Sequence, residues 1–292
     1  MGIRDSQMNS KVALITGASR GLGKVLAHRF WKSRYSLYLI ARSYDELQKV
    51  KTSLPPRSNQ ICDIDSCDLS IPESIEHLKS KLYTNFSRLD VLINNAAIQG
   101  PIGKTWTVSP SDWQKTIHIN LLAPVALCQI VVPLMKQAGG GVIINLSGGG
   151  ATAPRPNFSA YATAKAALIR FSETFAEETR EIGIRVNCIA PGAMKTALLG
   201  EILHKAPQLS GEKEFQLASK VFVEGGASME RVADLALFLA SEDSKGITGK
   251  LISAVWDRWE DWPFYLNELN KTDIYTLRRI VGRDRGMNWG DK

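Results

Sequence analysis

The sequence contains little cysteine, and its few cysteines are not arranged as a disulfide framework or a metal site. Four occur in 292 residues, with neither CxxC spacing nor a plausible pairing: Cys62, Cys67, Cys128 and Cys188. The four histidines do not cluster with cysteines or acids at ligand spacing. We therefore expect reduced, mostly buried thiols and no metal ion.

Long apolar runs are also missing. No run approaches the roughly 20 residues that a membrane-spanning helix needs, and the polar start MGIRDSQMNS lacks the charged-then-apolar pattern of a signal peptide. The start matches the Gly2/Ser6 pattern for N-myristoylation, but no polybasic segment follows it. These absences predict a cytoplasmic protein without a membrane anchor.

Negative charge is scarce in the first 60 residues. They hold 11 lysines and arginines against three acids, in a chain whose formal net charge is +7. This excess indicates an anionic partner, or else the ordinary solvated charges of helices. The chain shows no basic helix with interleaved aromatic residues and no zinc module, so a small phosphorylated ligand is favoured and a nucleic acid is not expected.

The chain is rich, by contrast, in short apolar runs separated by segments of helical periodicity. Seven runs of strand length span residues 11–16, 36–41, 61–65, 91–96, 141–147, 184–190 and 250–255. Strands buried on both faces, each followed by a helix, predict one α/β domain over residues 1–255 with a doubly wound parallel sheet. Residues 256–292 carry four of the seven tryptophans, so we expect this C-terminal extension to pack on the domain or on a neighbouring subunit.

The first run leads directly into the glycine-rich stretch TGASRGLG at residues 16–23. Glycines at 17, 21 and 23 permit a tight turn, and the backbone N–H groups at the start of the next helix favour a pyrophosphate. A turn with a purely structural role is the alternative.

A second motif, YATAK at 161–165, places Tyr161 and Lys165 on one helix face. The ammonium favours the phenolate and lowers the pKa of Tyr161, which makes this residue a usable acid/base. Ser147 ends the fifth run, where its hydroxyl can hold a substrate carbonyl, and Ser159 is interpreted as a helix cap. A tyrosine and a lysine at this spacing are also common as structural residues.

Together with NNAA at 94–97, Asn120 and PGAMKT at 191–196, these motifs resemble the short-chain dehydrogenase/reductase family, in its usual order, over about residues 10–253. The resemblance implies a Rossmann-like fold of about seven strands and hydride transfer between a nicotinamide cofactor and a ketone/secondary alcohol pair. It implies catalytic roles for Asn120, Ser147, Tyr161 and Lys165. It also implies the following cofactor-binding residues: Gly17, Ser19, Arg20, Gly21, Leu22, Gly23, Arg42, Ser43, Asp68, Leu69, Asn94, Ala96, Tyr161, Lys165, Pro191, Gly192, Met194 and Thr196.

The resemblance assigns parts of the cofactor to some of these residues. Asp68 with Leu69 would hold the adenine edge, although Asp68 is also a candidate cap for the helix that follows. Asn94 and Ala96 would line the floor beneath the nicotinamide half. Thr196 would touch the carboxamide, and Lys165 would bind the nicotinamide ribose.

The end of the second run indicates which dinucleotide is used. An acid at this place selects NAD, whereas this chain has Ala41 followed by Arg42. A guanidinium suits the extra phosphate of NADP, and Arg20 and Ser43 can reach the same group. We therefore expect NADP(H), with Arg42 as a solvated helix-start residue as the alternative.

Pro124 stands four residues after Asn120 and has no N–H to donate to the Asn120 carbonyl. If Asn120 lies within a helix, its carbonyl is left free. The resemblance implies that the main chain of this asparagine holds a water that supplies protons to the lysine. A helix kink without catalytic meaning is the alternative.

We predict an NADP(H)-dependent oxidoreductase that acts on a small carbonyl or alcohol as a homodimer or homotetramer. The alternatives are a sugar-nucleotide epimerase or dehydratase with the same tyrosine and lysine, and a non-catalytic NADP-binding sensor. The TGxxxGxG spacing disfavours the first, and the complete set of catalytic residues disfavours the second. Residues 197–226 are long enough for a lid, with Leu198, Leu199, Ile202 and Leu203 at helical spacing, although ordinary packing is the commoner role of such an apolar face. Arg155 is a candidate contact for an anionic substrate group.

Overall fold

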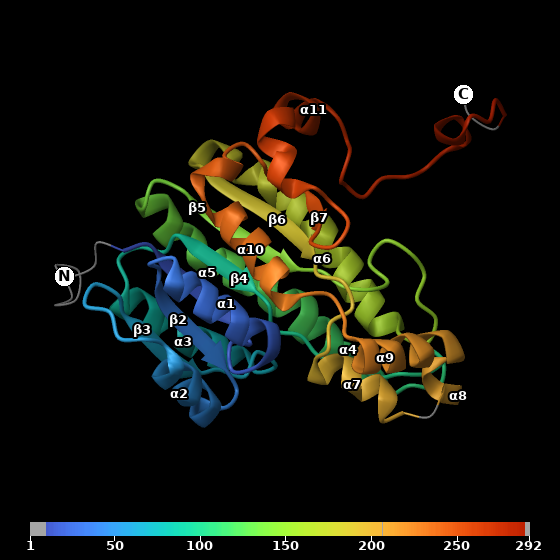
Figure 1. The fold of residues 1–292 in the computed structure, drawn as a ribbon, viewed down its shortest axis with the longest axis horizontal. Coiled ribbons are helices and arrows are strands. Elements are labelled where there is room, and N and C mark those ends of the chain that lie inside the picture. Colours follow the sequence, from blue (N-terminus) through green and yellow to red (C-terminus); the bar gives the residue numbers. More distant parts are fainter. Residues whose placement is uncertain (1–9, 206, 290–292) are drawn as a thin grey trace.

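A computed structural model describes residues 10–205 and 207–289, which form a parallel sheet covered by helices (Figure 1). The strand order is β3-β2-β1-β4-β5-β6-β7. The first three strands are added toward one edge of the sheet and the last four toward the other, so the order switches between the neighbouring strands β1 and β4. All seven predicted runs are strands, and the doubly wound sheet is confirmed. The strands are β1 Val12–Thr16, β2 Ser36–Ala41, β3 Cys62–Ser66, β4 Val91–Asn94, β5 Gly141–Leu146, β6 Ile184–Ala190 and β7 Leu251–Ser253.

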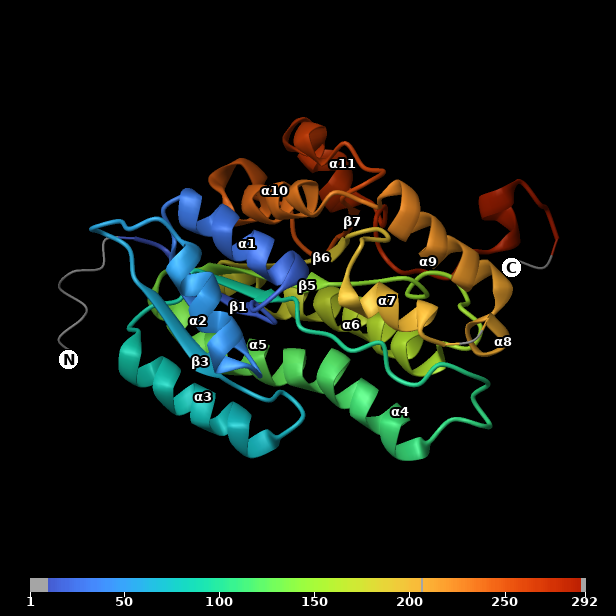
Figure 2. The ribbon, with the colours of Figure 1, turned by 60° about the horizontal axis from the view of Figure 1, so that its bottom comes forward.

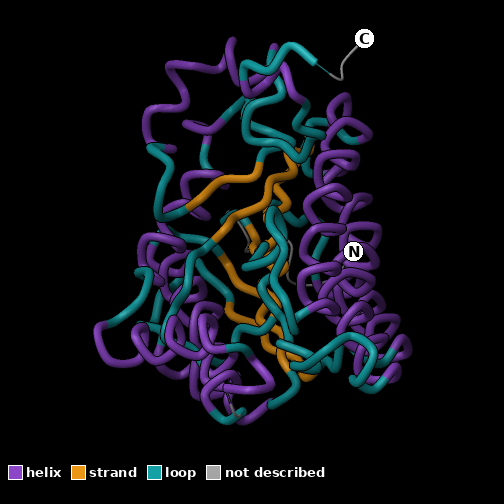
Figure 3. Tube along the Cα trace, turned by 90° about the vertical axis from the view of Figure 1, so that its right-hand side faces the viewer, coloured by secondary structure: helices purple, strands orange, loops and turns teal. Residues whose placement is uncertain are grey.

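Helices lie on both faces of this sheet (Figure 3). Their bounds are α1 Gly21–Lys32, α2 Tyr44–Ser53, α3 Pro72–Asn85, α4 Pro110–Ile117, α5 Ala123–Gln137, α6 Ser159–Glu178, α7 Ala197–Leu203, α8 Pro207–Ser210, α9 Glu212–Glu224, α10 Met229–Ala240 and α11 Leu266–Lys271. Figure 2 shows α1 and α10 on one side of the sheet, α3 and α5 on the other, and α7, α8 and α9 grouped together.

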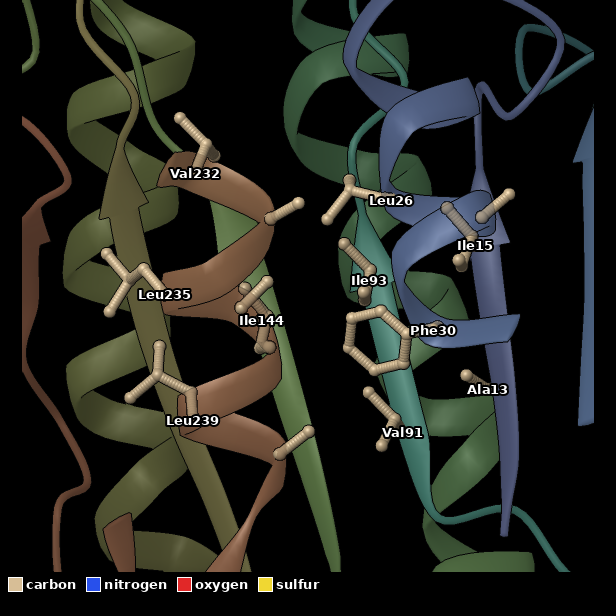
Figure 4. Packing of buried hydrophobic residues seen from close by; sticks show 14 of the residues in the cluster. Ala13, Ile15, Leu26, Phe30, Val91, Ile93, Ile144, Val232, Leu235 and Leu239 are labelled. Carbon is tan, nitrogen blue, oxygen red and sulfur yellow. The ribbon is translucent and has the colours of Figure 1, made fainter. Parts of the chain in front are cut away.

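The core explains why β1 reads VALIT without polar interruption. Ala13 and Ile15 pack beneath Phe30 of α1 on one face (Figure 4), whereas Val12 and Leu14 belong to the cluster on the opposite face. Successive side chains of a strand point to opposite faces. A strand covered by helices on both sides therefore needs apolar residues at every position.

One helical stretch differs from the sequence expectation. Residues 110–137 form a continuous helix of 28 residues, because α4 and α5 are joined by a π-helical turn at His118–Leu122. By length and composition this stretch is apolar enough to cross a membrane, although half of its apolar window is buried within the protein. The start of the chain, including Gly2 and Ser6, lies outside the described residues.

The extension after β7 packs partly on the domain. A 3₁₀ segment at Trp259–Tyr265 places Trp259 and Trp262 in the same core cluster as α1 and α10, and Leu269 of α11 joins them. Further along, the Tyr275 carbonyl accepts a hydrogen bond from Leu251 N at 2.8 Å, beside β7. In Figure 1 the end of the chain then extends away from the sheet and its helices.

Candidate active site

The glycine-rich turn joins β1 to α1, as the sequence predicts. Gly17 and Gly21 adopt φ values of +63° and +53°, a region that residues with a side chain rarely enter. A Cβ on Gly17 would lie 2.9 Å from the Ala96 Cα, and one on Gly23 would collide with the Gly17 carbonyl. Only glycine fits this turn, which leaves the backbone at the start of α1 open to an anion.

Asn95 fastens this turn to the loop after β4, a role that sequence reasoning did not assign. Its Nδ2 donates to the Thr16 carbonyl at 2.9 Å, and the backbone N–H groups of Asn95 and Ala96 both donate to Thr16 Oγ1 at 2.9 Å. The adjacent asparagines of NNAA could have indicated this role, because two amide side chains at the end of a buried strand need hydrogen-bond partners.

The Asn94 side chain is bound within the protein, and the predicted place of this residue beneath the nicotinamide half stays a prediction. Asn94 is buried in β4, and its Nδ2 donates to Asn145 Oδ1 at 2.8 Å. Asn145 in turn donates to Ser172 Oγ at 2.7 Å. The side chain is held inside the protein because the strand's alternation points it toward β5 and α6.

Arg42 and Ser43 follow β2 directly, and Arg20 precedes α1; all three are exposed or partly so. Ser43 caps α2, because its Oγ accepts a hydrogen bond from Glu46 N at 3.3 Å. Glu201 of α7 is a neighbour of Arg20 that the sequence did not indicate. Burial raises the pKa of the Glu201 carboxyl, and Arg20 is the largest of the positive charges that oppose this rise.

Asp68 does not cap a helix, which removes the alternative raised for it. The residue before α3 is Ile71, without a side-chain cap, while Asp68 Oδ1 accepts from Ser70 N at 2.8 Å and from Ser70 Oγ at 2.7 Å. Burial by itself raises the pKa of Asp68, but the Ser70 hydrogen bonds and the charge of Arg42 outweigh it and lower the pKa. Leu69 beside it is buried.

Ser147 lies directly after β5 with an unused hydroxyl. Its backbone N–H donates to the Ile189 carbonyl at 2.8 Å, which fixes its position beside β6. The residue is 4% exposed, and its Oγ has no hydrogen-bond partner among the described residues. A buried polar atom without a partner is costly, so this hydroxyl is suited to a molecule that completes its hydrogen bonding.

Tyr161 lies against the residue after Ser147, because a Cβ on Gly148 would collide with the Tyr161 hydroxyl. Four residues along α6, the Lys165 Nζ donates to the Leu146 carbonyl at 2.7 Å and lies 5.8 Å from the centre of the Tyr161 ring. Residues from the end of β5 and from one face of α6 therefore meet at one place, as predicted.

The predicted lowering of the Tyr161 pKa is wrong for the protein by itself. Burial raises the pKa of the Tyr161 phenol, and the charge that opposes this is Arg155 rather than Lys165. The buried Lys165 ammonium loses hydration, which lowers its pKa to about 8. The reasoning from helix spacing considered the charges and left out the desolvation of both groups.

Asn120 lies in the π-helical turn rather than in an ordinary α-helix. Ala123 N donates to the His118 carbonyl, five residues back. Pro124 explains the change, because its missing N–H removes one bond of the α-helical pattern. The Asn120 side chain accepts from Ile98 N at 3.0 Å and donates to the Ile98 carbonyl at 2.8 Å, so it holds the loop after β4.

Two further assignments are corrected. Ser159 does not cap α6; its Oγ accepts from Trp113 Nε1 at 3.2 Å. Arg155 is not free, because its Nε and Nη2 both donate to Glu214 Oε2, at 3.1 and 2.8 Å. Sequence spacing could not show either contact, since the partners come from α4 and α9.

The PGAMKT stretch follows β6 and leads into α7. Thr196 caps this helix by accepting from Leu199 N at 3.3 Å, and its methyl group lies 3.9 Å from where a Gly21 Cβ would be. The other predicted cofactor-binding residues of this stretch are buried Pro191, partly exposed Met194 and Gly192 at a φ of +79°. The apolar face of α7 packs internally: Ile202 belongs to a buried cluster with Ile102, Phe158 and Ala218, and Leu199 and Leu203 pack against this cluster.

The geometry and the motifs agree with a comparison against known families. The model of the family described as short chain dehydrogenase matches residues 11–207. The chain belongs to this family. It is therefore placed among oxidoreductases that use a nicotinamide cofactor on small molecules with CH–OH or C=O groups.

Individual relatives agree with this placement. Dehydrogenase/reductase SDR family member 4 of Homo sapiens is 29% identical over 85% of this chain and 87% of its own length. The 3-oxoacyl-[acyl-carrier-protein] reductase FabG of Thermotoga maritima is 30% identical over 84% of this chain and 96% of its own. The solved structure of YwfH, an NADPH dependent reductase involved in bacilysin biosynthesis, is 30% identical over 84% of this chain and 97% of that one, with a TM-score of 0.76.

Proposed function

We propose that this protein is an NADP(H)-dependent reductase or dehydrogenase that interconverts a ketone and a secondary alcohol. The observation that carries the proposal is the buried Ser147 hydroxyl, which has no hydrogen-bond partner among residues 10–205 and 207–289 and lies one residue from the Tyr161 contact. A substrate carbonyl or hydroxyl oxygen bound here completes the hydrogen bonding of Ser147. The same oxygen would then lie where it can exchange a proton with the Tyr161 hydroxyl.

The residues present fit a nicotinamide dinucleotide. The turn that accepts only glycine at positions 17 and 23 would hold the pyrophosphate at the start of α1. Arg20 and Arg42 would hold the extra phosphate of NADP, and Ala41 supplies no acid for an unphosphorylated ribose. When bound, this cofactor supplies or accepts the hydride.

The protein's own residues handle the proton. In reduction, Ser147 donates a hydrogen bond to the carbonyl oxygen and Tyr161 gives its proton to that oxygen. The raised pKa of Tyr161 suits the acid role, because the phenol stays protonated. Lys165 replenishes the proton from a position beneath the ring, with the main chain of Asn120 as the site of a feeding water.

The test is NADPH oxidation, followed by absorbance, across a panel of ketones and sugar nucleotides. We expect turnover of at least one ketone and a lower kcat/KM with NADH than with NADPH. The Ser147→Ala variant should turn over at about one hundredth of the unmodified rate or less. Conversion of a sugar nucleotide without net NADPH consumption would indicate the epimerase, and no turnover of any compound would indicate the sensor.

We further propose that the protein works in the cytoplasm as a homodimer or homotetramer. Support for the oligomer comes from the end of the extension, where apolar residues such as Ile280 and Trp289 are exposed. A chain that ends at Leu277 keeps the buried tryptophans, so its sedimentation shows whether the last 15 residues hold subunits together. An unchanged oligomer size, with unchanged KM for the ketone, would contradict a role in assembly or in the substrate pocket.

A further inference from the structure

The pair formed by Arg155 and Glu214 joins the loop after β5 to helix α9 close to Tyr161. The two side chains are only 12% and 21% exposed. Arg155 directs two of its N–H groups at one oxygen, Glu214 Oε2. Its guanidinium carbon lies 3.9 Å from the centre of the Phe158 ring, which is itself fully buried. The pair is therefore held in place rather than exchanging freely with water.

Glycines of the loop that carries Arg155 lie close to its side chain. A Cβ on Gly150 would lie 2.9 Å from the Arg155 Cβ, and one on Gly149 would lie 3.7 Å from its Nη1. On the inner side, the guanidinium carbon lies 5.8 Å from the centre of the Tyr161 ring. The arginine thus stands between helix α9 and the residue that exchanges the proton.

The charges around Tyr161 come from three elements. Lys165 lies on its own helix, Arg155 comes from the loop after β5, and Glu214 comes from α9. An arginine beside a site ordinarily attracts a carboxylate or phosphate. Here a carboxylate of the same chain already occupies two of its donors, so this wall of the site carries no net charge.

We propose that Glu214 determines substrate specificity by occupying Arg155, so that the site takes uncharged ketones and rejects oxo acids. This inference rests on the proposed function. A substrate carboxylate near Arg155 would have to displace Glu214 from a largely buried pair or lie beside a like charge, and both are unfavourable. An uncharged substrate meets neither penalty.

The test compares two probes that share a 3-oxobutanoyl group, the neutral ester ethyl acetoacetate and the acid acetoacetate, by kcat/KM with NADPH. In the unmodified enzyme we expect the ester to be preferred by at least about tenfold. Glu214→Gln keeps the shape and removes the charge, so Arg155 gains an unbalanced positive charge. The ratio should then move toward the acid by about tenfold.

Two further variants separate charge from structure. Arg155→Gln combined with Glu214→Gln restores a neutral wall, so the preference for the ester should return. Glu224→Gln removes a charge from the same helix at an exposed position beside Lys220 and should leave the ratio unchanged. If Glu214→Gln lowers both substrates by one factor, the pair is only structural and the proposal is overturned.

A failure of the proposed function is distinguishable from a failure of this inference. If neither probe is reduced by the unmodified protein, the proposed activity on these ketones is contradicted. The affinities of the NADPH-loaded protein for the ester and the acid, measured by calorimetry, still give the ratio without turnover. The absence of a difference in that ratio between the unmodified protein and Glu214→Gln overturns the inference.

Discussion

The end of β5 with the start of α6 and the extension after β7 use their side chains in opposite ways. At β5 and α6, polar groups are buried: Lys165 is 2% exposed, and the Ser147 hydroxyl has no partner among the described residues. In the extension, large apolar groups are exposed, with Trp256 at 85% and Phe264 at 83%.

Each arrangement costs free energy in the isolated chain, because buried polar groups lose hydration and exposed rings order water. Such costs are typical of places that bind something. The first place suits a small polar molecule, and the second suits a broad apolar surface. We therefore assign the proposed chemistry to the first place and contacts with another surface to the second.

The largest effect should come from Tyr161→Phe, which removes only the hydroxyl. Turnover should fall by about a thousandfold, as loss of a general acid typically does, while NADPH affinity stays nearly unchanged. Steady-state rates and a fluorescence titration of NADPH measure the two quantities. Turnover within about threefold of the unmodified enzyme would show that another group exchanges the proton.

The extension should respond in stability rather than in chemistry. Trp262 is 5% exposed and packs against the Tyr275 ring with centroids 4.4 Å apart, so Trp262→Ala should lower the free energy of unfolding by about 3–5 kcal/mol. Trp256→Ala, at an exposed position, should change it by less than about 0.5 kcal/mol. Urea unfolding of both variants measures the difference. Equal effects would mean that the extension is not divided into a buried and an exposed part.

Cofactor preference should change without loss of the fold. Ala41→Asp with Arg42→Leu adds a ribose acceptor and removes a phosphate partner, so the ratio of kcat/KM for NADPH over NADH should fall by about a hundredfold. Lys24→Leu, an exposed change in α1, is the matched control. An unchanged preference in the double variant would assign the selection to Arg20.

The smallest effect concerns the pH dependence of alcohol oxidation, in which Tyr161 must accept a proton. Arg155 opposes the burial that raises the pKa of Tyr161. Arg155→Gln removes this opposing charge, so the pKa rises further and the rising limb of the pH–rate profile moves to higher pH. Arg155→Lys keeps the charge and should keep the limb near its original position. A limb that moves equally in both variants would show a loss of packing rather than of charge.

Local sequence patterns predicted the sheet and most of the site's positions, because they depend on neighbours in the chain. The seven strands follow from apolar runs, and the meeting of Ser147 with Tyr161 follows from strand ends and helix spacing. The errors concern contacts between distant segments. Trp113 uses the Ser159 hydroxyl, and Glu214 binds Arg155. No spacing within one element could reveal such contacts.

The π-helical turn beside Asn120 was also unpredicted, although its cause was visible. Pro124 predicts one free carbonyl if Asn120 lies within a regular helix, and the structure has a π-helical turn here, in which Ala123 N donates to the carbonyl five residues back. The direction of the Tyr161 pKa shift was not predicted for a related reason, since the burial of this side chain depends on the whole fold. Inference from neighbouring residues in the sequence was correct only where packing against distant segments did not change the hydrogen bonds or the burial of a side chain.

The hydrogen bond from Leu251 N to the Tyr275 carbonyl has a consequence for the behaviour of the protein in concentrated solution. An outermost strand with unpaired backbone groups invites another chain to add to the sheet, which is the first step of many aggregates. Residues near Tyr275 cover this border: the Lys250 Nζ also donates to the Ile274 carbonyl at 3.1 Å. Proteolytic loss of the segment would uncover the border and expose the folded protein to edge-to-edge association.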